Sequence, residues 1–101
     1  MFGHVEDSPR RWASHLLSIR DAAAAANAAA ATSDGDGVGR GGHRRRGRIT
    51  EFVPLPFVHM QAPVYLKGGA RRGPTLRECV LLHAVARLAL HPHVTNIQAS
   101  W

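Results

Sequence analysis

The chain has 101 residues, of which 45% are hydrophobic, and a formal net charge of +6. This length fits one domain or part of one, with the composition of an ordinary globular protein. The excess charge is concentrated in five arginines within nine positions: Arg40, Arg44, Arg45, Arg46 and Arg48. The other eight basic residues are nearly balanced by seven acidic residues. The chain outside this run therefore has a net charge of +1, which excludes a uniformly basic surface.

A single cysteine, Cys79, excludes an internal disulfide and a four-cysteine zinc site. It fits a reducing compartment, so we expect the cytoplasm or an organelle stroma. The sequence contains no run of roughly 18 apolar, uncharged residues, so no transmembrane helix is predicted.

Residues 1 to 31 predict a strand followed by a helix. Ser8 is placed as an N-cap, and Pro9 follows at the first helical position. Apolar residues then recur at the three- and four-residue spacing of a helix packed on a sheet: Trp12, Leu16, Ile19 and Ala23. An alanine tract begins at Ala22, and because it has little surface to bury we expect the helix to fray there.

Residues 32 to 48 predict a disordered insertion, because they combine six glycines and five arginines with one apolar residue, Val38. A run of arginines among glycines is also typical of RNA-binding tails. The rival hypothesis is therefore a small basic nucleic-acid-binding module acting through this loop. No aromatic residue lies within 40 to 48 to stack on a base, which favours the insertion.

Residues 49 to 101 predict a strand, a helix and a strand. The β-branched and aromatic residues from Ile49 to Val53 fit a strand, which should leave the sheet at Pro54 and Pro56 because proline has no N–H to donate. We expect Leu55, between these prolines, to be buried.

A second helix is predicted to begin after Thr75, which has Glu78 three residues on, the spacing of a capping box. It should end at His91-Pro92. Its apolar face comprises Leu76, Cys79, Leu82, Val85, Ala86 and Leu90. Val94 to Trp101 alternates enough to form a third strand, and the element order predicts an α/β fold with parallel strands. Because an interior strand ends the chain at Trp101, we expect a truncated gene product.

Three segments carry a resemblance to a known family: EFVPLPFVH, APVYLKGGARRGPT and HAVARLALHPHVTNIQASW. They resemble the late part of FO synthase, in its tyrosine-transferring half, and the similarity covers residues 1 to about 20 and 48 to 101. It implies a fragment of a radical S-adenosylmethionine (SAM) barrel, with three parallel strands and two helices. Residues 22 to 47 would be an insertion relative to the family.

The family implies an activity as well as a fold. The complete enzyme would join a tyrosine-derived hydroxybenzyl unit to 5-amino-6-ribitylaminouracil, using SAM and a 4Fe–4S cluster. The three cysteines that hold such a cluster are absent here, so we expect this chain to bind no cluster and to be inactive alone.

The resemblance also suggests cofactor-binding residues. The opening MFGHVE is similar to the end of the G-x-I-x-G-x-x-E pattern that packs on SAM, which assigns Gly3 and Glu6 to the cofactor. Taken alone, these two residues would be an ordinary strand end. Cys79, His83, His91 and His93 could together be ligands of a metal ion. However, a cysteine on an apolar helix face is usually a buried hydrophobic residue.

Four residues are candidates for the substrate pocket: His4, Glu51, His59 and Gln98. Glu51 is costly within an apolar strand unless it is paired, so we expect it to face the barrel interior with a partner such as an arginine or a substrate amine. His59 leaves the strand at its carboxyl end, where it could bind a carbonyl or exchange a proton, although a solvated loop histidine is the plain alternative. Gln98 alternates with Ile97 and would face the same interior. No catalytic residue can be assigned.

Overall fold

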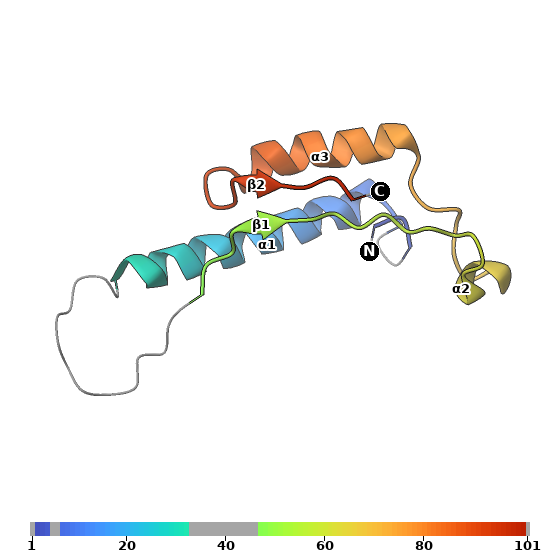
Figure 1. Cartoon of the computed structure of the whole chain (residues 1–101), viewed down its shortest axis with the longest axis horizontal. Coiled ribbons are helices and arrows are strands. Elements are labelled where there is room, and N and C mark those ends of the chain that lie inside the picture. Colours follow the sequence, from blue (N-terminus) through green and yellow to red (C-terminus); the bar gives the residue numbers. More distant parts are fainter. Residues whose placement is uncertain (1, 5–6, 33–46, 101) are drawn as a thin grey trace, which may run out of the picture.

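The structure is a computed structural model that describes residues 2–4, 7–32 and 47–100. It has an α/β fold with the element order α1 (Pro9–Ala31), β1 (Glu51–Phe52), α2 (Pro63–Leu66), α3 (Leu76–Leu90) and β2 (Asn96–Ile97) (Figure 1). The two strands are parallel, with Glu51 opposite Asn96 and Phe52 opposite Ile97. The predicted α/β class with parallel pairing is confirmed.

Helix α1 begins where the sequence predicts, with Ser8 extended at the N-cap and Pro9 in the first turn, although the Ser8 side chain makes no capping hydrogen bond. The predicted fraying at Ala22 is wrong, because the helix continues to Ala31. Alanine has the highest helix propensity, and Ala23 is fully buried. Asn27 Nδ2 also donates a hydrogen bond of 3.0 Å to the His93 carbonyl, which ties the tract to the segment after α3.

Helix α3 begins with the predicted capping box. Thr75 Oγ1 accepts a hydrogen bond from the Glu78 backbone N–H, and the Glu78 carboxylate accepts one of 2.6 Å from the Thr75 backbone N–H. This backbone hydrogen bond lowers the pKa of Glu78. The buried face is narrower than predicted, because Leu76 and Val85 are 69% and 41% exposed.

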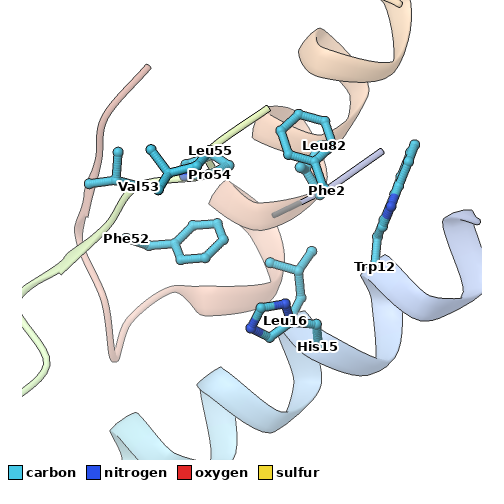
Figure 2. A pocket seen from close by; sticks show the side chains of 9 residues that line it. All are labelled: Phe2, Trp12, His15, Leu16, Phe52, Val53, Pro54, Leu55 and Leu82. Carbon is cyan, nitrogen blue, oxygen red and sulfur yellow. The ribbon is translucent and has the colours of Figure 1, made fainter. Parts of the chain in front are cut away.

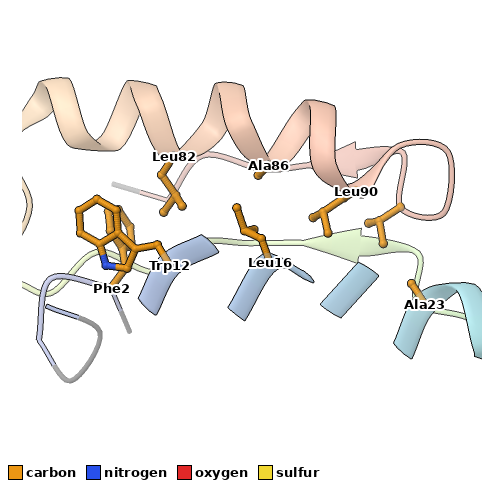
Figure 3. Close-up of a cluster of buried hydrophobic side chains, with 8 residues drawn as sticks. Phe2, Trp12, Leu16, Ala23, Leu82, Ala86 and Leu90 are labelled. Atoms are coloured by element: carbon orange, nitrogen blue, oxygen red, sulfur yellow. The ribbon is translucent and has the colours of Figure 1, made fainter. Parts of the chain in front are cut away.

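The hydrophobic core lies between α1 and α3 (Figure 3). Its buried members are Phe2, Trp12, Leu16, Ala23, Leu82, Ala86, Leu90 and Val94. Phe52 of β1 and Ile97 of β2 pack against the same cluster. Because strand side chains alternate between faces, the neighbouring Glu51 and Gln98 point away from the helices.

The strands are shorter and fewer than predicted. The described residues contain two strands and not three, and the N-terminal segment contributes one parallel bridge, between Phe2 and Pro56. Phe2 N–H donates to the Leu55 carbonyl and Phe57 N–H to the Phe2 carbonyl, at 3.2 and 3.0 Å. The predicted strand from Ile49 to Val53 shortens to β1, and Pro54 and Pro56 have no N–H groups with which to continue the pairing.

Leu55 is 52% exposed and not buried. Helix α2 was not predicted, although Pro63 stands in its first turn. The predicted disorder of 32 to 48 falls mainly on residues 33 to 46, which lie outside the described residues. Within the described part of the chain, no helix is both long and apolar enough to cross a bilayer.

Candidate functional site

Glu51 and Gln98 form a polar pair on the face of the sheet that is turned away from the helices. Gln98 Nε2 donates a hydrogen bond to Glu51 Oε1. The Gln98 backbone N–H donates to the Phe52 carbonyl at 3.0 Å, which extends the parallel pairing by one residue and fixes the position of the amide. Both side chains are exposed. The sequence suggested an arginine or a substrate amine as the partner of Glu51, whereas in the structure Gln98 donates to it.

A second candidate region, here called the strand-exit hollow, lies where the chain leaves β1 and approaches the start of α3. It has a volume of about 360 Å³. Its described lining consists of Phe2, Pro56, Phe57, Val58, His59, Met60, Arg72, Pro74, Cys79, His83 and Ser100. The lining includes His59 but neither Glu51 nor Gln98, so the predicted pocket residues divide between two places.

His59 stands at the hollow beside an aromatic neighbour. Its ring meets the Tyr65 ring edge-on, with centroids 4.8 Å apart. Arg72 Nε donates a hydrogen bond of 3.4 Å to the Tyr65 hydroxyl, and this bond raises the pKa of Arg72. His59 is half-buried rather than a freely solvated loop histidine.

Gly3 and His4 hold the N-terminal segment against the wall of the hollow. Gly3 has a φ of +82°, and a Cβ there would lie 2.5 Å from Pro74 Cδ, so only glycine fits. The His4 ring packs on the Phe57 ring at 4.7 Å. The space beside Gly3 is filled by Pro74, so the contact that requires glycine is with the chain itself. Glu6, the other predicted cofactor residue, lies outside the described residues.

The sequence did not single out Arg72, and it suggested His83 only as a candidate metal ligand. His83 Nδ1 lies 2.7 Å from the Cys79 carbonyl oxygen. His83 Nε2 is buried and has no hydrogen-bond partner among the described residues. The spacing of Cys79 and His83 was visible as a candidate metal pair, but His83 contacts the carbonyl of Cys79 and not its thiol. Burial raises the pKa of that thiol.

A smaller cavity of about 110 Å³ lies between α1, α3 and the segment after β1 (Figure 2). Its lining comprises Phe2, Trp12, His15, Leu16, Phe52, Val53, Pro54, Leu55 and Leu82. His15 is the one ionisable residue among these described lining residues, and four of the others are buried members of the core cluster. We interpret this cavity as a gap in the core packing.

Comparison with known proteins identifies similar chains. FO synthase from Streptomyces coelicolor is 48% identical over all 101 residues, and FO synthase from Mycobacterium tuberculosis strain H37Rv is 44% identical over the same length. The resemblance to FO synthase is confirmed. The 5-amino-6-(D-ribitylamino)uracil--L-tyrosine 4-hydroxyphenyl transferase of Methanopyrus kandleri is also 44% identical over the whole chain.

The chain spans 9% of the length of these FO synthases and 22% of the M. kandleri transferase. No family model matches the chain, and no solved structure does.

The chain does not provide a complete binding site for the 4Fe–4S cluster that the resemblance implies, and its described candidate for SAM does not face open space. A 4Fe–4S cluster of the radical SAM kind needs three thiolates, and the chain has one cysteine. Gly3, the described candidate for SAM, faces Pro74. The chemistry that this chain can supply is therefore that of its polar side chains at the strand ends.

Proposed function

We propose that this chain forms part of the substrate-facing wall in the tyrosine-transferring half of an FO synthase. The complete enzyme would join a hydroxybenzyl unit from tyrosine to 5-amino-6-ribitylaminouracil. The observation that carries this proposal is the match of all 101 residues to part of the M. kandleri protein, whose name states a 4-hydroxyphenyl transfer involving L-tyrosine and this ribitylaminouracil. The chain covers 22% of that protein and 9% of the FO synthases. Because the same 101 residues match both proteins, the matched segment of the longer FO synthases is the part that resembles the transferase.

The arrangement of the sheet supports a role in the wall. In (β/α) barrels the helices surround the strands, and ligands bind at the carboxyl ends of the strands. Here Phe52 and Ile97 face the helices, so Glu51 and Gln98 would face the barrel interior next to those ends. SAM and a 4Fe–4S cluster, held by other parts of the enzyme, would supply the radical chemistry.

Glu51 would bind a donor group of a substrate. A carboxylate has about four lone-pair sites, and the amide of Gln98 occupies one on Oε1. The remaining sites can accept hydrogen bonds from the ammonium group of tyrosine or from the amine and N–H groups of the aminouracil. Gln98 would hold the carboxylate in position.

The test is a chimeric enzyme in which these 101 residues replace the matched segment of S. coelicolor FO synthase. With tyrosine, SAM and the aminouracil, together with the other substrates of the native enzyme, we expect the chimeric enzyme to form FO, detected by chromatography and fluorescence. Iron content and solubility compared with the native enzyme provide the control. A soluble chimeric enzyme with a full cluster and no product would contradict the proposal.

A further inference from the structure

Arg72 brings an accessible positive charge to the strand-exit hollow. It lies on the loop between α2 and α3 (Figure 1), it lines the hollow, and it is exposed. Its Nε donates a hydrogen bond to the Tyr65 hydroxyl, whereas the four N–H groups on its two Nη atoms have no partner among the described residues. The edge of the guanidinium formed by these two atoms is therefore free to bind a ligand.

Tyr65 connects this arginine with His59. The His59 ring meets the Tyr65 ring edge-on, with centroids 4.8 Å apart, and His59 also lines the hollow. Tyr65 itself is half-buried on α2. A long side chain that is already held through Nε loses less conformational freedom when a ligand binds its Nη atoms. The contact with Tyr65 therefore prepares Arg72 for binding.

The charge of Arg72 is not neutralised within the described part of the chain. The described lining of the hollow contains this one arginine and no acidic residue. The nearest acid along the sequence is Glu78, which pairs with Arg71 at 3.0 Å and accepts a hydrogen bond from the Thr75 backbone N–H. The hollow is thus an electropositive place at the strand exit.

The rest of the hollow suits an apolar ligand body. Its volume of about 360 Å³ lies within the range of roughly 300 to 1,000 Å³ for small-molecule sites. Phe57, Val58 and Met60 contribute apolar side chains to its lining. Val58 and Met60 are 59% and 72% exposed, so an occupant that covers them removes apolar surface from water.

We infer that the strand-exit hollow binds a small organic carboxylate, with its carboxylate on the Nη atoms of Arg72 and its apolar body over Val58 and Met60. A guanidinium donates two parallel hydrogen bonds to a carboxylate, and its single charge matches that of the ligand. The site is independent of the proposed function, because Glu51 and Gln98, which carry that function, are not among its described lining residues.

Other anions fit the hollow less well. Inorganic phosphate has no apolar body to cover the exposed side chains of the wall. A nucleic acid presents a row of phosphates and is bound through several cations, whereas the described lining of the hollow offers one arginine. A carboxylate attached to an apolar group satisfies both the cation and the wall.

The test titrates the ¹⁵N-labelled 101-residue chain with 3-phenylpropionate, its neutral isostere 3-phenylpropionamide, and inorganic phosphate, followed by NMR. We expect 3-phenylpropionate to shift the amide resonances of residues 57 to 60 and Ser100 in a saturable manner. The neutral amide should bind at least about tenfold more weakly, because it lacks the charge-assisted hydrogen bonds, and phosphate should leave these resonances unchanged.

Three outcomes of this titration would overturn the inference. One is equal affinity for the acid and the neutral amide. Another is a set of acid-induced shifts confined to residues 40 to 48, where the arginines are concentrated. The third is tighter binding of phosphate than of 3-phenylpropionate at the hollow. None of these comparisons needs a variant.

A matched pair of variants provides the second measurement. Arg72→Gln removes the charge at the hollow, so it should weaken 3-phenylpropionate binding about tenfold. Arg77→Gln removes an exposed arginine of α3 that is not among the described lining residues, and it should leave binding unchanged. Arg72→Lys keeps the charge without the paired donors and should give an intermediate affinity. Equal losses for Arg72→Gln and Arg77→Gln would show a general effect of charge and contradict the site.

These measurements are independent of product formation. A chimeric enzyme that forms FO while 3-phenylpropionate fails to bind the chain would overturn only the carboxylate site. Binding of 3-phenylpropionate through Arg72 with an inactive, cluster-loaded chimeric enzyme would overturn only the proposed function.

Discussion

Replacing Glu51 with Ala in the chimeric enzyme is expected to lower FO formation by about tenfold or more, the loss typical of a positioned polar group at a reacting site. Glu51 is exposed on the sheet face away from the core, so its removal should leave folding and iron content nearly unchanged. The loss should come from weaker or misplaced substrate binding.

Two further variants separate this role from a general effect of charge. Gln98→Ala removes the donor to Glu51 Oε1 and should give a smaller loss, because the carboxylate remains but is less well held. Asp21→Ala removes an exposed carboxylate of α1 that pairs with Arg20 at 2.9 Å, and it should leave turnover unchanged. Full turnover of Glu51→Ala with both substrates would mean that this face is structural.

Leu90→Ala is expected to cost about 2 to 5 kcal/mol of unfolding free energy, the range measured for leucines removed from protein cores. Leu90 is fully buried between α3 and α1 (Figure 3). The loss combines the missing apolar contacts with the cavity left behind. Urea unfolding of the 101-residue chain, followed by far-ultraviolet circular dichroism, would measure it.

Leu88→Ala is the matched control on the same helix. Leu88 is 80% exposed, so the same truncation should change the unfolding free energy by less than about 0.5 kcal/mol. Comparable losses at positions 88 and 90 would show that the described orientation of α3 is wrong for the chain in solution.

The sequence predicted the helices better than the strands, because helix signals are local. Thr75 and Glu78 satisfy each other within one turn, and their spacing alone located the start of α3. The strands depend on partners distant in the sequence, and Pro54 and Pro56 limit the N–H groups available for pairing, so alternation could not give their lengths. The alanine tract of α1 continues as helix because alanine favours helix and Ala23 is buried, and Asn27 also bonds to the His93 carbonyl, 66 residues away.

The candidate site was predictable to a similar extent. Alternation placed Gln98 on the same face as Glu51, in agreement with the hydrogen bond between their side chains. It could not predict that His59 belongs to a different region, because the strand-exit hollow is built by segments that meet only after folding. The contact of His83 Nδ1 with the Cys79 carbonyl could not be predicted either, because no side-chain pattern records a contact with the backbone.

Hydrogen–deuterium exchange of the chimeric enzyme tests most directly whether the strand ends face substrate. With tyrosine and the aminouracil bound, exchange should slow in residues 51 to 59 and 96 to 100 and stay unchanged at Ala84 to Leu88 on α3. Substrates that protect other parts of the enzyme but leave both strand ends unchanged would contradict the assignment of this chain to the pocket wall.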